Sequence, residues 1–266
     1  MDHVNYLPLF IIVAGIMIVG MLIVMITVDE VKLNREMAEY EKAHPEEQVT
    51  ITEESGEEKL PPEVKRSLLL LLFSIALWFI SYNALETWFT TYANRMWNMS
   101  LGSATTCLTI ATLGAILSYI PVGAIAGKIG RKKTILTGVV MMTTCFIICF
   151  IFTLVSDQFS PILYVLFAVI GMGWAAINVN SLPMVVEMCK GSDIGKFTGY
   201  YYTFSMAAQI VTPIIAGALM SHVGYTTLFP YAAIFMAAAF ITMIQVKHGD
   251  SKLITKKGLE AFDFDD

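Results

Sequence analysis

The sequence predicts an all-α integral membrane protein with seven transmembrane helices. Apolar side chains make up 56% of the 266 residues and charged side chains only 15%, whereas soluble domains carry roughly 25% charged residues. The charges are clustered, so that seven long runs are almost free of them. Each run reaches the ~20 residues that a helix needs to cross a hydrocarbon core about 30 Å thick. None of the runs shows the period-two alternation of a β-strand.

The seven predicted spans are joined by short connections after the first one. They cover residues 7–28, 67–92, 103–126, 134–155, 161–188, 197–220 and 226–246. The first run is too long for a signal peptide and lacks a basic leader, so we expect it to be retained as a membrane span.

Lys and Arg are divided very unevenly between the connections. Alternate connections hold 16 and one of the 17 basic residues, and the single one is Arg95. Cytoplasmic loops of membrane proteins carry the excess of Lys and Arg. We therefore expect the chain in the plasma membrane with its N-terminus outside and its C-terminus in the cytoplasm.

Two polar segments lie outside the predicted bundle. Segment 29–66 contains 12 of the 22 acidic residues and three prolines, which predicts a flexible linker with a helix over 29–43. The tail 247–266 is also polar and is predicted to be loosely ordered. The expected organisation is a first helix in 1–28, an acidic cytoplasmic linker in 29–66, a six-helix bundle in 67–246 and a cytoplasmic tail in 247–266.

Strongly polar side chains are concentrated in four of the seven spans. The first, fourth and seventh spans are almost free of them and can face lipid. In the other four, polar residues recur every three or four positions, which places them on one helical face. These stripes are Asn83, Glu86, Thr90 and Asn94; Thr105, Thr109 and Thr112; Gly171, Trp174, Asn178 and Ser181; and Tyr202, Ser205, Gln209 and Thr212. Four such helices would enclose a polar lumen; the alternative is that the stripes join helices by hydrogen bonds.

Glu86 is an acidic residue within a predicted span. An ionised carboxylate there costs about 2.5–3.5 kcal/mol on insertion scales. A carboxyl that alternates between its charged and neutral forms is what proton coupling requires, whereas a structural hydrogen bond is the alternative role. Three other spans contain Pro121, Pro183 and Pro213, which are expected to kink or interrupt them.

Several classes of function are disfavoured. The chain has no broad basic face for nucleic acid, and its four cysteines have no spacing typical of a metal site or a disulfide framework. Neither His-Glu-x-x-His nor Gly-x-Ser-x-Gly occurs. We expect no enzyme activity, no metal site and no cofactor.

The turn after the third span combines glycines with a cluster of positive charge. From Gly123 to Lys133 it reads GAIAGKIGRKK. This segment resembles the loop signature of the major facilitator superfamily, which is Gly, three residues, Asp, Arg or Lys, one residue, Gly, Arg, and Arg or Lys. Gly127 stands at the Asp position, which fits the degenerate copy of the signature that follows the eighth helix in this family.

The resemblance implies an arrangement for the whole chain. The family has twelve helices in two halves joined by a long cytoplasmic loop. Span 7–28 would be the sixth helix, 29–66 the central loop and the other six spans the second half. The ninth and twelfth helices, which face lipid with the sixth, would then be the fourth and seventh spans. The run from Tyr200 to Phe204 is similar to the sucrose-type and glycoside–cation symporter branches.

The resemblance also implies a function, which is secondary transport of a small polar solute by alternating access, with coupling to a proton or cation. A sugar is one candidate solute. The residues expected on the path are Asn83, Glu86, Trp174, Asn178 and Gln209. In the basic turn, Arg131 is expected to pair with Glu187 as a cytoplasmic gate, while Gly123 and Gly127 let helix ends approach closely. The complete expected gate is Gly123, Gly127, Lys128, Gly130, Arg131, Lys132 and Glu187.

Two alternatives stay open from the sequence. A seven-span receptor would have the same topology, although the long first connection and the basic turn argue against it. Half a facilitator contains half of a substrate path. The chain is therefore expected to be a piece or split product that joins an N-terminal half-transporter, or to pair with a second copy.

Overall fold

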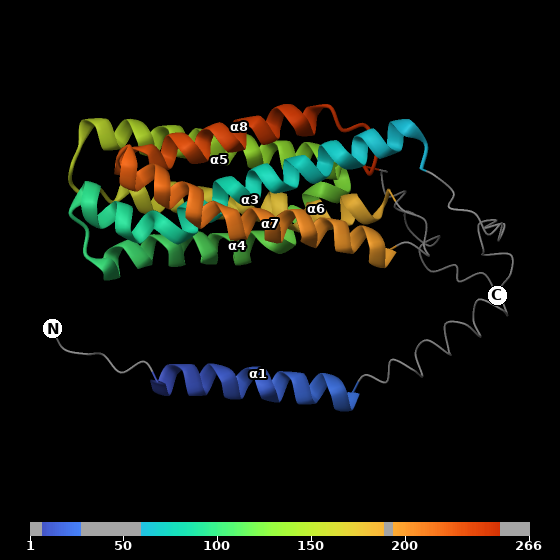
Figure 1. Cartoon of the computed structure of the whole chain (residues 1–266), viewed down its shortest axis with the longest axis horizontal. Coiled ribbons are helices and arrows are strands. Elements are labelled where there is room, and N and C mark those ends of the chain that lie inside the picture. The colour runs from blue at the N-terminus through green and yellow to red at the C-terminus, as the bar shows by residue number, and fades with distance from the viewer. Residues whose placement is uncertain (1–6, 28–59, 189–193, 251–266) are drawn as a thin grey trace, which may run out of the picture. The chain divides into compact units, whose positions relative to one another are not determined.

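The structure is a computed structural model that describes residues 7–27, 60–188 and 194–250. The regular elements in these ranges are seven α-helices and one short 3-10 helix (Figure 1). They are α1 (Leu7–Thr27), α3 (Pro62–Trp97), α4 (Leu101–Ile129), α5 (Arg131–Val155), α6 (Ile162–Val186), α7 (Ile194–His222), η2 (Tyr225–Thr227) and α8 (Leu228–Ile244). All seven α-helices, with η2 extending the last one, are long and apolar enough to cross a membrane, so the predicted all-α membrane fold is confirmed.

Several helices are longer than their apolar runs. Helix α3 begins at Pro62, inside the range predicted as linker, because a proline at the first helical position needs no hydrogen-bonded N–H. It ends where Asn98 adopts a left-handed conformation with φ 49°. The helix predicted over 29–43 lies outside the described residues.

Helix α1 forms a unit separate from residues 59–266. Its side chains are almost entirely aliphatic, and those described are exposed, as for Ile26 at 82%. A helix that is apolar all round suits a lipid environment.

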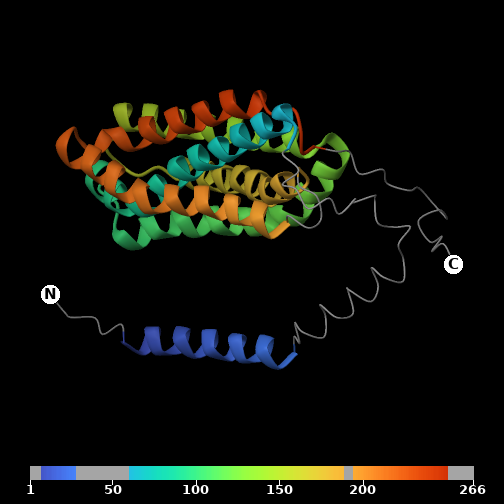
Figure 2. The same ribbon diagram turned by 45° about the vertical axis from the view of Figure 1, so that its right-hand side comes forward.

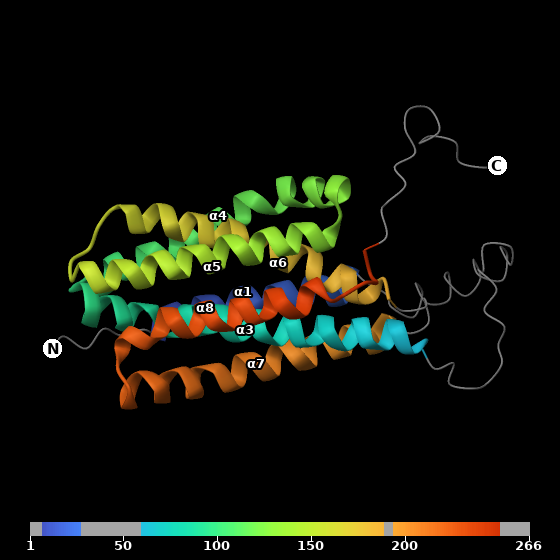
Figure 3. The same ribbon diagram turned by 90° about the horizontal axis from the view of Figure 1, so that it is seen from above.

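Helices α3 to α8 pack lengthwise in two groups of three. Helices α4 and α5 lie along α6, while α7 and α8 lie along α3, and Figure 3 shows both groups from above. Contacts between α5 and α8 join the groups. As a result, α5 and α8 form one face of the bundle, and α4 and α7 lie on the opposite face (Figures 1 and 2).

Glycines allow α6 to approach its neighbours closely. A Cβ placed on Gly171 would overlap the carbonyl oxygen of Ala111 in α4, and one on Gly138 of α5 would lie 2.5 Å from the carbonyl oxygen of Gly173. Membrane helices associate through such small residues because lipid provides no hydrophobic force between them. The packing of α6 against both neighbours therefore requires the absence of side chains at these points.

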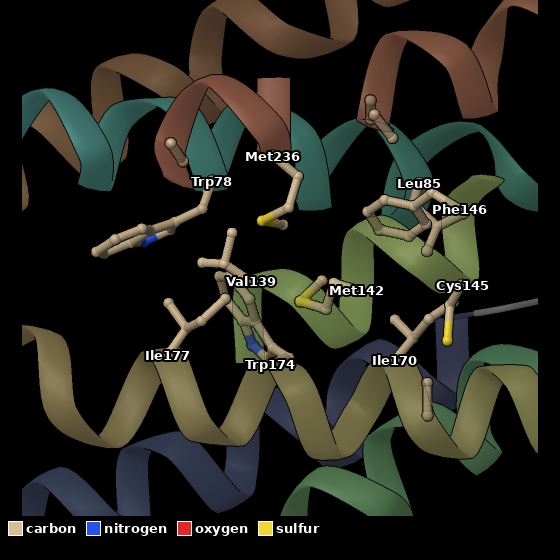
Figure 4. Packing of buried hydrophobic residues seen from close by; sticks show 14 of the residues in the cluster. Trp78, Leu85, Val139, Met142, Cys145, Phe146, Ile170, Trp174, Ile177 and Met236 are labelled. Atoms are coloured by element: carbon tan, nitrogen blue, oxygen red, sulfur yellow. The ribbon is translucent and has the colours of Figure 1, made fainter. Parts of the chain in front are cut away.

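The core fills the space between the two groups. Figure 4 shows Val139 and Met142 of α5 among side chains of α3, α6 and α8. Trp78, Met236 and Ile177 are fully buried there. Each of these large residues comes from a different helix, so the core fixes the relative rotation of the helices.

A row of serines joins α3 to the C-terminal part of the bundle. Ser67, Ser74 and Ser81 are seven residues apart and therefore lie on one face of α3. Their hydroxyls lie 2.8 Å from Nδ1 of His248, 2.7 Å from Oγ1 of Thr242 and 2.6 Å from the carbonyl oxygen of Ala232.

The three prolines lie inside α4, α6 and α7, and each helix continues through its proline. The expected interruption is therefore wrong. At Pro213 the neighbouring helix supports the backbone, because Trp88 donates its indole N–H to the Pro213 carbonyl at 3.1 Å.

Replacing Gly171 by Ala should destabilise the bundle. The added methyl group must displace the Ala111 backbone, and overpacking of this kind costs about 1–3 kcal/mol. We expect a lower melting temperature in detergent than for the unmodified chain.

Gly199→Ala is the matched control, since a Cβ on this α7 glycine meets nothing within 4 Å. Alanine is the better helix former, so this variant should keep or raise the melting temperature. Equal melting temperatures for the two variants would contradict the proposed close contact of α4 and α6.

Candidate functional site

A cavity of about 260 Å³ lies among α3, α4, α6 and α7. These are the four helices for which the sequence predicts polar stripes. The lining residues are Phe79, Tyr82, Asn83, Glu86, Thr112, Ala115, Ile116, Tyr119, Trp174 and Gln209.

Four of the five expected path residues line this cavity. Asn83 and Glu86 come from α3, Trp174 from α6 and Gln209 from α7. Asn178 is not among the lining residues, although it lies one helical turn after Trp174. The residues of the stripe predicted on α6 therefore have different surroundings: Trp174 lines the cavity, whereas Gly171 packs against α4.

Aromatic rings form one wall of the cavity. The rings of Tyr82 and Trp174 are stacked, with centroids 4.0 Å apart and planes 7° apart. Phe79 meets Trp174 edge-on at 5.2 Å. Sequence reasoning missed Phe79, Tyr82 and Tyr119, although Phe79 and Tyr82 precede Glu86 by seven and four residues and so share its helical face.

Two of the lining side chains donate a hydrogen bond within their own helix. Asn83 donates its amide N–H to the Phe79 carbonyl at 2.8 Å, and Thr112 donates its hydroxyl to the Leu108 carbonyl at 3.0 Å. The side-chain oxygens of both residues keep acceptor capacity. Glu86 supplies a carboxylate, and the lining contains no Lys, Arg or His.

A second polar cluster lies at the end of the bundle where α4 gives way to α5, which we call the basic end. Arg131 and Glu187 form an ion pair through Nη1 and Oε2. Both side chains are partly exposed, at 25% and 22%. The pairing expected from the sequence is therefore present between the start of α5 and the end of α6.

Residues 245–250 follow α8 and pack across this end; we call them the C-terminal strap. Asp250 accepts a hydrogen bond from the backbone N–H of Arg131, with 2.6 Å between N and Oδ1. Its carboxylate thus satisfies one of the unpaired N–H groups at the start of α5 and lies at the positive end of the helix dipole.

Lysine and glycine residues hold the strap in place. Lys132 donates from Nζ to the carbonyls of Ile244 and Val246, at 2.7 and 2.6 Å. Gly249 has φ +84°, and a Cβ there would lie 2.5 Å from the Met184 carbonyl oxygen of α6.

These contacts correct two expectations for the basic end. Within the described residues, a Cβ on Gly123 or Gly127 would meet nothing within 4 Å, so neither glycine serves a close approach of helix ends there. Gly130 is the glycine that is required, because it has φ +99° and a Cβ there would lie 2.9 Å from Asp250 Oδ2. The tail was predicted to be loosely ordered, but its first residues, 247–250, pack against the bundle. Lys128 is exposed.

The sequence of the chain also matches a known protein family. The family model for the Major Facilitator Superfamily matches residues 96–264, which is more than half of the chain. The chain belongs to the major facilitator superfamily. Its seven apolar helices make it a multi-pass membrane protein.

The chain is also similar to several individual proteins. It is 25% identical over 198 residues to the uncharacterized protein YqgE of Bacillus subtilis, an alignment that covers 71% of this chain and 44% of YqgE. It also resembles a POT family transporter solved in complex with 5-aminolevulinic acid, with a TM-score of 0.55 and 19% identity over 67% of this chain and 37% of that one. For the human organic anion transporter MFSD10 (TETRAN) the TM-score is 0.55 and the identity 13%, over 71% of this chain and 49% of that one. The chain therefore spans less than half the length of these proteins.

Removing the Asp250 carboxylate should loosen the first turn of α5. Loss of a capping carboxylate costs about 1 kcal/mol, so Asp250→Ala should speed amide hydrogen exchange at residues 131–134 by about fivefold. Asp157→Ala is the control, since Asp157 is an exposed acidic residue in the α5–α6 connection. Unchanged exchange in Asp250→Ala would show that its carboxylate does not stabilise this turn.

Proposed function

We propose that the chain is the C-terminal half of a secondary active transporter. It moves a small polar solute across the membrane by alternating access, coupled to a proton or cation. The observation that carries this proposal is the cavity, where polar and aromatic side chains from four helices meet in a member of the major facilitator superfamily. The similarity to the sucrose-type and glycoside–cation branches makes a sugar one candidate solute. The family match gives no support to a seven-span receptor.

The partner in this proposal is a second half-transporter, either an N-terminal half or another copy. The α4 and α7 face exposes large aliphatic side chains beside the cavity, with Ile120 of α4 at 86% and Ile210 of α7 at 70% exposure. Polar lining residues between apolar flanks suit a path enclosed by two helical units. Asp29–Arg66 would then be the central loop, 67–246 the second half-bundle and α1 the last helix before that loop.

Glu86 is the coupling residue in this proposal. It is the carboxylate that lines the cavity, and it lies on the same α3 face as Asn83. Proton binding there changes the charge of the path without moving a helix. Trp174 and Gln209 would contact the solute from α6 and α7, and Asn178 would lie deeper on the path.

The basic end acts as the cytoplasmic gate. The Arg131–Glu187 pair links α5 to α6, and the C-terminal strap links α5 to α8 and α3. Opening requires the ion pair to separate. The excess of Lys and Arg in alternate connections supports a cytoplasmic position for this end and an outside position for the N-terminus, and the membrane in this proposal is the plasma membrane.

Gradient-driven solute uptake tests the function and the role of Glu86 together. Vesicles that contain the chain together with its partner half should accumulate solute when a pH gradient is imposed, and Glu86→Gln should remove the response to the gradient. Asp157→Asn removes a carboxylate outside the cavity and should leave uptake unchanged. A Glu86→Gln protein with the same gradient dependence would exclude Glu86 from coupling, and absence of any gradient-driven uptake would contradict the proposed function.

Charge reversal tests the gate. Arg131→Glu or Glu187→Arg alone places like charges together and should lower the uptake rate by about tenfold or more, because like charges at close range are destabilising. The double variant restores an ion pair in the opposite orientation and should recover most of that rate. A double variant no better than the single ones would show that the pair does not control opening.

A further inference from the structure

We infer that the cavity binds an organic cation, a ligand that carries an ammonium group on a small apolar body. This inference rests on the proposed function, since it names the class of solute for the same site. It comes from the charge, the hydrogen-bonding capacity and the aromatic surface of the lining.

The charge of the lining favours a cation. Glu86 places a carboxylate at the cavity, and the residues that line it include no basic side chain. Glu86 is exposed in this chain, and its carboxylate attracts a cation at close range. An ammonium group is such a cation, whereas a carboxylate or phosphate ligand would add repulsion.

The hydrogen-bonding capacity points the same way. One amide N–H of Asn83 and the hydroxyl hydrogen of Thr112 are used within their own helices, and the side-chain oxygens of both residues keep acceptor capacity. With the Glu86 carboxylate they make a set of acceptors on α3 and α4. An ammonium group consists of donors alone and therefore matches this set.

The aromatic wall provides the third element. Faces of Trp and Tyr rings attract cations within about 6 Å. The Tyr82–Trp174 stack is held by the edge-on contact with Phe79, so its orientation is fixed before a ligand arrives. Ala115 and Ile116 of α4 line the same cavity and would cover the apolar part of the ligand.

The volume of the cavity suits a small ligand. About 260 Å³ lies just below the ~300–1,000 Å³ range of small-molecule pockets. The cavity therefore fits a compact amine or quaternary ammonium compound.

A pair of isosteric probes tests the inference on the purified full chain in lipid nanodiscs. Choline carries a quaternary nitrogen, and 3,3-dimethyl-1-butanol has the same shape with a neutral carbon in its place. We expect saturable binding of choline, measured by equilibrium dialysis, with an affinity at least about tenfold above that of the neutral alcohol.

Variants distinguish the effect of losing the Glu86 carboxylate from the effect of misfolding. Glu86→Gln should lower choline affinity by about tenfold or more and leave binding of the alcohol unchanged, whereas Glu86→Asp should retain part of the cation preference. Asp157→Asn should bind choline as the unmodified chain does. Size-exclusion profiles identical among the variants exclude misfolding as the cause.

Equal affinity for the two probes, unchanged choline binding in Glu86→Gln, or no choline binding would each overturn the inference. These results are distinguishable from failure of the proposed function. A chain that ignores choline but accumulates a neutral solute under a pH gradient would still be a transporter of another class of solute, and a chain that binds choline without any gradient-driven uptake would retain the site but not the function.

Discussion

Backbone contact between α6 and its neighbours α4 and α5 is the constraint on which the rest of the bundle depends. The glycines at these contacts remove side chains where two backbones meet, and a lipid environment offers few other ways to hold helices together. Once α6 is fixed in this way, the directions in which its other side chains point are also determined. Trp174 turns toward α3 and the cavity, while the helix end brings Glu187 to Arg131.

Helix α6 thereby connects the two polar clusters. Trp174 and Glu187 are thirteen residues apart, which corresponds to about 20 Å along an α-helix. The helix continues through Pro183 between them. A displacement of α6 at the cavity would therefore reach the ion pair at the basic end through one continuous element, and the strap would pass it on to α3 and α8.

Much of this arrangement could be predicted from residue patterns, because a membrane imposes long apolar helices and polar residues on the buried faces. The stripes on α3, α4, α6 and α7 predicted the helices that line the cavity, and Arg131 was correctly paired with Glu187. The aromatic wall was missed because Tyr82 and Phe79 look like core residues in an apolar run. The Asp250 contact was also missed, since a pairing between residues 119 positions apart leaves no local pattern. The prediction that Gly123 and Gly127 allow close approach was wrong for a related reason. The motif identifies a turn, but packing decides which of its glycines meets another segment, and here it is Gly130.

The C-terminal strap has a consequence for how the protein is made. Arg131 is synthesised 119 residues before Asp250, whose carboxylate accepts a hydrogen bond from the Arg131 backbone N–H. The carbonyls of Ile244 and Val246, which accept hydrogen bonds from Lys132, are also synthesised more than 100 residues later. The first six membrane helices can insert while this end of the bundle is still without its last contacts. The contacts of the basic end can therefore form only after residues 244–250 have been synthesised, and a chain that stops near residue 245 would lack Asp250 and its contact with Arg131.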